Sequence, residues 1–267
     1  MRYQSEINRE LYPLDDPSAR EAIVARARRE LGETGCVALG DFLNPPAIRD
    51  LAAEATALLE RAHRRDLKMS VRAEDLAEAQ KSALLARPSR TAQWTLAGDH
   101  LDNSSLIRKL YEDPQLLELI RSILGMDELY RCADPMLDCN VTYMRDGDEH
   151  GWHFDDNDFV VSLLLQKSEW GGGFEYAANI REQGLDAIIP VLEDRSPETR
   201  RPEVAPGTLM LFQGRQSLHR VAPIGGERPR IIALFSFDKR PDMVFSETVR
   251  QNAVGRRTPL SAEPDRH

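Results

Sequence analysis

The sequence predicts an α+β fold, with helices packed outside a β-sandwich or barrel, because its hydrophobic period changes near residue 129. Apolar residues recur at helical spacing in the first 128 residues. Beyond them, apolar residues form short β-rich runs separated by Gly, Pro and Asp clusters. A chain of 267 residues suits one domain with a well-buried core. We expect a helical part (1–128), a strand-rich core (129–240) and a C-terminal tail (241–267).

Charge and cysteine content limit the classes of function. Acidic residues outnumber basic ones (35 − 44 = −9) and no basic stripe is present, so a nucleic acid is an unfavourable partner. No apolar run is long enough to cross a bilayer, and no apolar signal segment follows Met1. The three cysteines form no C-x-x-C pair, which is typical of reduced thiols. We therefore expect a cytoplasmic protein that does not associate with membranes.

The first part of the chain carries helix start and stop signals. Asp16 and Pro17 begin a helix that Gly35 ends, and a short strand at 36–39 follows. After Asn44-Pro45-Pro46, an apolar stripe predicts a second helix up to residue 65, with His63 on its polar face.

Residues 66–103 have the least regular pattern in the chain. The segment 72–86 favours a helix, whereas 86–100 has the composition of a loop. Ser104-Ser105 then caps a helix that ends at Gly125 and is broken at Pro114.

The second part of the chain predicts strands joined by tight turns. The β-rich runs are 139–144, 159–165, 174–177, 208–212, 218–224 and 230–237. The tail from Val249 to His267 is rich in Arg, Pro and polar residues, so we expect it to be loosely held.

Three residues in this strand-rich part have the pattern of a metal site. His153 and Asp155 form an H-x-D pair, and their side chains point the same way if the segment is extended. A second histidine, His219, lies in a later β-rich run. Two imidazoles and one carboxylate on one face of an iron leave three adjacent positions open, as in non-haem Fe(II) oxygenases.

The region of roughly 129–240 resembles the Fe(II)/2-oxoglutarate-dependent oxygenases and their double-stranded β-helix fold, which is jelly-roll or cupin-like. The resemblance rests on motifs in family order: His153-x-Asp155, GGGFEY, GTLMLF, SLHRV and the late Arg230. More narrowly, WHFDDNDFVVSLLLQ and SLHRVAPIGGERPRIIALFSFD are similar to the free-amino-acid hydroxylases and radical halogenases, whose best-known members act on lysine.

This resemblance implies the cofactors and the residues that hold them. Fe(II) would bind His153, Asp155 and His219, and the open positions would take 2-oxoglutarate and O2. A guanidinium suits the distal carboxylate of the oxo-acid, and we assign Arg230 to it, with Arg228 as the alternative.

Further site residues follow from the same resemblance. Tyr143 could hydrogen-bond the oxo-acid, although strand tyrosines commonly serve packing. His150, Asp156 and Arg90 are candidates for substrate contact, Asp156 favouring a cationic substrate. For each of these three, a solvated polar residue of a loop or turn is the alternative interpretation.

The predicted activity is hydroxylation of an unactivated C–H bond of a free amino acid, basic and lysine-like in one version, or of a similar small metabolite. Succinate and CO2 would be released. In the radical halogenases the carboxylate position is Gly or Ala, so Asp155 favours hydroxylation over halogenation. Desaturation or cyclisation is a variant of the same chemistry. The alternative from another class is a non-catalytic, cupin-like metal-binding protein. The oligomeric state stays open.

Overall fold

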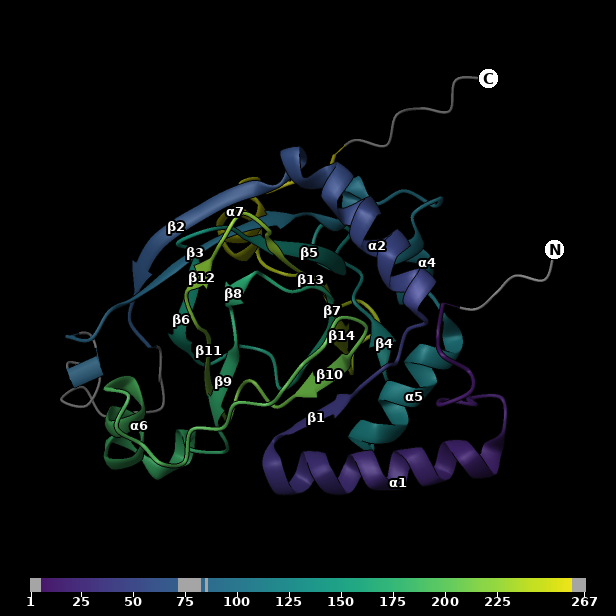
Figure 1. Cartoon of the computed structure of the whole chain (residues 1–267), viewed down its shortest axis with the longest axis horizontal. Coiled ribbons are helices and arrows are strands. Elements are labelled where there is room, and N and C mark those ends of the chain that lie inside the picture. The colour runs from purple at the N-terminus through teal and green to yellow at the C-terminus, as the bar shows by residue number, and fades with distance from the viewer. Residues whose placement is uncertain (1–5, 72–82, 85, 261–267) are drawn as a thin grey trace.

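The computed structural model describes residues 6–71, 83–84 and 86–260. Within these residues, ten strands form one antiparallel sheet that curls around a central space (Figure 1). The strand order is β1 (Cys36–Leu39), β10 (Leu209–Phe212), β7 (Val160–Gln166), β13 (Arg230–Phe235), β5 (Cys139–Met144), β3 (Ser89–Leu96), β6 (Glu149–His153), β11 (Leu218–Val221) and β9 (Phe174–Ala177), with β2 (His63–Met69) paired to β3. The predicted α+β jelly-roll class is confirmed.

Two short strand pairs complete the β structure of the described residues. One joins β8 (Trp170–Gly171) to β12 (Ile224–Gly225), and the other joins β4 (Tyr130–Arg131) to β14 (Phe237–Asp238).

Helices cover the outside of the curled sheet (Figure 1). The helices α1 (Pro17–Thr34), α2 (Pro45–Leu58), α4 (Leu106–Tyr111) and α5 (Pro114–Leu124) share one apolar core with the outer faces of β1, β10, β7, β13 and β5. On the other side, α6 (Leu185–Leu192) shares a second core with Trp152, Phe154 and Leu218. Because side chains alternate along a strand, burying the outer face in this way leaves the inner face for the site.

The predicted helix ends are confirmed by their caps. The Asp16 carboxylate accepts hydrogen bonds from the first turn of α1, and Gly35 ends this helix with a φ of +73°. Ser105 caps α4, and Asp113 caps α5 directly before Pro114.

Two predictions about the elements were wrong. The second helix ends at Leu58, and His63 begins strand β2. Part of the segment predicted as a loop, Ser89–Leu96, is strand β3. Polar and apolar residues do alternate along this strand, but the loop-like residues on either side, such as Pro88 and Gly98, obscured the alternation. The predicted helix at 72–86 lies largely outside the described residues.

The tail contains an ordered helix, α7 (Glu247–Val254), where a loosely held segment was expected. The Nε atom of Arg250 donates to the carboxylate of Asp134, 2.6 Å away, and the amide of Phe245 donates to the same carboxylate at 3.0 Å. Asp134 is fully buried, so this pairing holds the tail against the sheet. A partner 116 residues away in the sequence cannot be read from the tail's composition.

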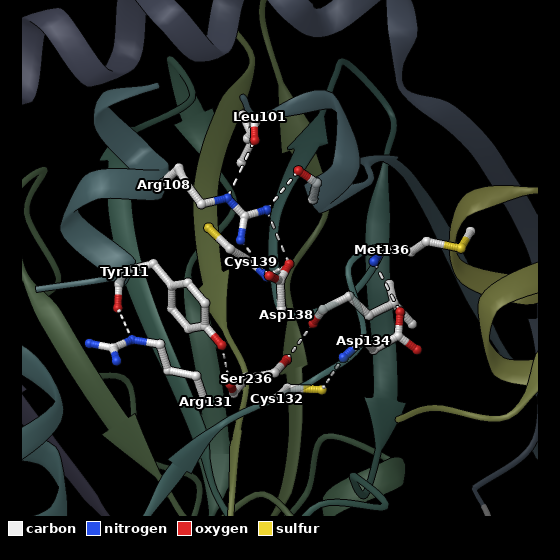
Figure 2. Close-up of polar contacts among 12 residues, drawn as sticks. Leu101, Arg108, Tyr111, Arg131, Cys132, Asp134, Met136, Asp138, Cys139 and Ser236 are labelled. Carbon is white, nitrogen blue, oxygen red and sulfur yellow. Dashed lines mark hydrogen bonds and ion pairs between the residues drawn. The ribbon is translucent and has the colours of Figure 1, made fainter. Parts of the chain in front are cut away.

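A network of buried polar groups joins α4 to β5 and β13 (Figure 2). Arg108 pairs with Asp138 and donates to the carbonyl of Gly98 at 2.8 Å. The Ser236 hydroxyl donates to the Leu137 carbonyl at 2.6 Å, and the Tyr111 hydroxyl donates to the Ser236 carbonyl at 2.9 Å. These contacts fix the start of β5, whose inner face lines the site described below.

Candidate metal centre and adjoining cavities

The sheet brings the three predicted metal ligands together. His153 on β6 and His219 on β11 are direct cross-strand partners. Asp155 lies two residues beyond β6, and its Oδ2 is 3.2 Å from Nε2 of His219. One ligand atom from each residue lies within 4.8 Å of the others, so the group could hold a metal ion. In an octahedron with bonds of about 2.1 Å, neighbouring ligand atoms lie about 3 Å apart, which fits this spacing.

Backbone carbonyls set the orientation of both imidazoles. Nδ1 of His153 lies 2.8 Å from the carbonyl oxygen of Gly151, and Nδ1 of His219 lies 2.9 Å from that of Ser217. A carbonyl only accepts, so Nδ1 carries the hydrogen and Nε2 presents its lone pair to the site. Burial lowers the pKa of His153, which favours the neutral ring that a metal requires.

Asp155 supplies a carboxylate oxygen that the protein leaves unsatisfied. Its Oδ2 is buried and accepts no hydrogen bond from any described residue. Burial alone would raise the pKa of Asp155, but interactions with His219 and His153 hold that pKa well below its ordinary value. A buried anionic oxygen without a hydrogen-bond donor is unfavourable unless a cation binds it, so this oxygen is suited to be a metal ligand.

Gly214 makes room for this carboxylate. The carbonyl of Gly214 accepts the Asp155 amide at 3.1 Å, and a Cβ at Gly214 would lie 1.9 Å from Asp155 Oδ2. Any side chain there would displace the ligand, so Gly214 is a site residue that sequence reasoning missed.

A cavity of about 160 Å³ lies inside the barrel beside the triad. Arg230 lies in its wall with 7% of its surface exposed. Its guanidinium makes no hydrogen bond or ion pair with any described residue, and burial lowers its pKa to about 10. A buried, unpaired cation is unfavourable by itself, so its place in a cavity indicates an anionic ligand.

The surroundings of Arg230 distinguish it from Arg228. Arg228 donates to the carbonyls of Lys167 and Ser168 at 3.0 and 3.3 Å, outside this cavity. Gly172, with a φ of +67°, lies against Arg230, and a Cβ there would meet its Cδ at 3.2 Å. Gly172 of the GGG run thus packs closely against the buried arginine.

A second cavity, of about 420 Å³, meets the first at Asp155. Gln93 and Thr142 line both spaces. The residues between Met243 and Ala253, which include the start of α7, form one wall of the second cavity, and strands β3 and β5 form the opposite wall. Asp155 therefore lies between two chambers, one with a buried cation in its wall and one lined by the C-terminal segment.

The halogenase D family model matches residues 19–253. The chain belongs to the halogenase D family. No curated protein matches the sequence at a significant level.

Solved structures share the fold at low sequence identity. One is a 2OG-Fe(II) oxygenase family oxidoreductase from Burkholderia pseudomallei, with 15% identity, a TM-score of 0.53, and coverage of 82% of this chain and 92% of that one. The epimerase SnoN in complex with Fe3+, alpha ketoglutarate and nogalamycin RO matches with 15% identity and a TM-score of 0.54. This match covers 93% of this chain and 98% of that one. EctD from S. alaskensis, with 2-oxoglutarate and 5-hydroxyectoine, matches with 18% identity and a TM-score of 0.55. The match covers 82% of this chain and 78% of that one. The chain thus has the fold of these oxygenases.

Two predicted site residues of this halogenase D family member lie outside both cavities. The Tyr143 hydroxyl donates to the Ala55 carbonyl at 2.7 Å, among the buried side chains under α2. Thr142 and Met144 take the inner face of β5, so alternation places Tyr143 on the outer one. Arg90 is likewise outside, where its guanidinium pairs with Asp66 of β2 at 2.8 Å. Tyr143 and Arg90 therefore line neither of the two cavities.

The other two candidates lie at the chambers. The His150 ring stacks on that of His153, with centroids 3.9 Å apart, and it lines the first cavity. Burial and the neighbouring histidines hold the pKa of His150 well below its ordinary value. Asp156 is exposed at the edge of the second cavity.

Sequence reasoning also missed the polar residues of β3. Gln93 and Thr95 face the second cavity, because the segment that contains them is a strand of the barrel. The signal was present: polar residues at 91, 93 and 95 alternate with Ala92, Trp94 and Leu96. No helix among the described residues has the length and apolar character that a bilayer crossing requires.

Proposed function

We propose that this chain is an Fe(II)- and 2-oxoglutarate-dependent dioxygenase that hydroxylates an unactivated C–H bond of a free amino acid or a similar small metabolite. The observation that carries the proposal is the buried, unpaired Arg230 in a cavity that also contains the His153, Asp155 and His219 ligand group. A metal-binding module without a co-substrate has no use for a buried cation. Arg230 therefore favours an enzyme over a cupin-like metal-binding protein.

The donor set fits iron. Two neutral imidazoles and one carboxylate on one side leave adjacent positions for an oxo-acid and O2. Bound iron, 2-oxoglutarate and O2 together supply an oxidant that can break an unactivated C–H bond, with succinate and CO2 as the other products. Two of the solved structures with this fold contain the oxo-acid, which supports the choice of co-substrate.

The residues of the chain orient the reactants and exclude water. Arg230 would bind the distal carboxylate of 2-oxoglutarate in a bidentate manner, which directs its other end toward the ligand group. Apolar residues enclose the first cavity around the co-substrate, including Phe174, Met210 and Phe212. A dry enclosure strengthens the ion pair with Arg230. The second cavity, on the other side of Asp155, would take the substrate.

The family name makes halogenation the second candidate. Against it, Asp155 has the carboxylate that radical halogenases lack, and Gly214 has no side chain that would displace this carboxylate. A filled ligand position leaves no site for a halide. We therefore propose hydroxylation as the reaction of the unaltered chain.

The test is anaerobic reconstitution with Fe(II) and 2-oxoglutarate, followed by exposure to O2 with a panel of free amino acids, in buffer with and without chloride. We expect a weak visible charge-transfer band before oxygen, then succinate and a product heavier by one oxygen atom. A chlorinated product would instead establish the halogenase. Without the band and without succinate, the cupin-like metal-binding protein would be the better description.

A further inference from the structure

The second cavity contains buried polar side chains that the protein does not satisfy. Gln93 and Thr95 come from β3, and Asn140 and Thr142 come from β5. Their exposed fractions lie between 4% and 9%, and none of the four side chains forms a hydrogen bond with the described part of the chain. Buried amides and hydroxyls are nearly always paired, so these four require a ligand or ordered water.

The four side chains form one continuous patch. Thr95 and Thr142 are direct cross-strand partners, which brings their side chains together on the inner face. Gln93 and Asn140 each lie two residues from one of these threonines, so alternation places them on the same face. The patch starts at the triad, because Gln93 and Thr142 also line the first cavity. A group bound along it would therefore reach the metal centre.

Few charged side chains line this chamber. Among the described residues that line it, the charged ones are Arg65, Asp155 and Asp156. Asp155 belongs to the proposed metal site, and Asp156 is exposed. No further carboxylate of the described chain faces the buried floor. An ammonium group placed there would lose its hydration without gaining a counter-ion, which is unfavourable.

The two ends of a substrate thus meet different chemistry. The charged groups common to all amino acids can pair with Asp156 and Arg65, which both line the chamber. The buried end meets two amides and two hydroxyls, which both donate and accept hydrogen bonds. The facing wall, with Phe245 and Val249, is apolar and would cover hydrocarbon.

We infer that Gln93, Thr95, Asn140 and Thr142 select a substrate whose buried end is uncharged and hydrogen-bonding, such as a carboxamide or a hydroxyl. The inference rests on the proposed function and narrows its substrate class, in place of the basic side chain that the sequence suggested. The preference would be for a neutral polar amino acid, such as glutamine, asparagine or homoserine, over lysine or ornithine.

The experiment compares these five amino acids on the protein loaded with Fe(II) and 2-oxoglutarate. The readouts are the shift of the visible band on anaerobic addition and the rate of oxygenated product formation. We expect kcat/KM for the best neutral compound to exceed that for lysine and ornithine by at least about tenfold, since unpaired buried groups penalise a mismatched ligand. Equal or better use of a basic amino acid, or no response to any neutral one, would overturn the inference.

Substitutions in the patch make the test independent of the panel. Asn140→Asp adds a carboxylate at constant size and should move the preference toward ornithine and lysine. Thr95→Val and Thr142→Val keep the shape and should raise KM for the neutral substrate. Tyr143→Phe, on the outer face of the same strand, should leave the preference unchanged.

Failure of the inference and failure of the proposed function give different results. Succinate formed slowly without any amino acid reports the oxygenase alone. If it forms while Asn140→Asp leaves the preference unaltered, the patch does not select the substrate and the enzyme assignment stands. If neither the band nor succinate appears under any condition, the proposed function itself is wrong.

Discussion

The network around Asp134 and Asp138 and the walls of the two cavities both contain buried polar groups attached to β5, but only the first is satisfied. In the network, Arg108 has a carboxylate and two backbone carbonyls as partners (Figure 2). In the first cavity, Arg230 is more deeply buried, yet it contacts no acceptor among the described residues. Ser236 and Thr142 repeat the contrast, since the Ser236 hydroxyl has a carbonyl partner and the Thr142 hydroxyl has none.

This difference separates groups that stabilise the fold from groups that bind ligands. Folding stability requires that a buried polar group find its partner within the chain. A binding site requires that the partner arrive later. The four predictions below test this division, each by changing one side of it.

The largest effect is expected at the metal ligands. His219→Ala should remove one of the three ligands and reduce succinate formation to the level seen without iron, as should a chelator on the unaltered protein. The fold should persist, because the backbone pairing of β11 with β6 and β9 does not depend on this imidazole. Iron-dependent succinate in the variant would remove His219 from the site.

Asp134→Ala should cause the largest loss of stability. Its buried carboxylate accepts hydrogen bonds from Arg250 and from the amides of Met136 and Phe245. The substitution therefore leaves the Arg250 guanidinium without its counter-ion and two backbone N–H groups without an acceptor. We expect a loss of about 3–5 kcal/mol in the free energy of unfolding, measured by chemical denaturation. A loss below that of an ordinary surface substitution would show that the network is not structural.

Arg230→Met should impair co-substrate binding without lowering stability, the opposite of what is expected for Asp134→Ala. The substitution removes the proposed partner of the 2-oxoglutarate carboxylate, so the KM for this co-substrate should rise on the order of 100-fold. Stability should be unchanged or higher, because a buried unpaired charge is lost. Steady-state kinetics and thermal denaturation report the two effects separately. An unchanged KM would exclude Arg230 from the co-substrate site.

The smallest effects are expected for the two hydroxyls. Ser236→Ala should destabilise the protein by about 1 kcal/mol, since it leaves a carbonyl unpaired. Thr142→Val should be neutral or slightly stabilising, since its hydroxyl has no partner to lose. The two melting temperatures, compared side by side, should differ in this direction. Equal losses would indicate that Thr142 is satisfied in solution.

Much of the helical framework could be predicted because its signals are local. Pro17, Gly35, Ser105 and Gly125 act within one helical turn, and the structure places each at the expected helix end. Strand β3 was missed although polar and apolar residues alternate along it, because its neighbouring residues have loop composition and its polar face lies against a cavity rather than a core. The first residues of strand β2, up to residue 65, were mistaken for a helix because their partners in β3 lie about thirty residues further along the chain.

The sequence by itself determined the fold class, the helix ends at Pro17, Gly35, Ser105 and Gly125, and the pattern of His153, Asp155 and His219, because these depend on spacing and residue type. Only the tertiary structure decided which side of a strand faces the cavity, and so placed Thr142 inside and Tyr143 outside. It also decided which cations find a partner, which separates Arg230 from Arg90 and Arg228. The physical reason is that satisfaction of a buried charge depends on residues brought together from distant parts of the chain.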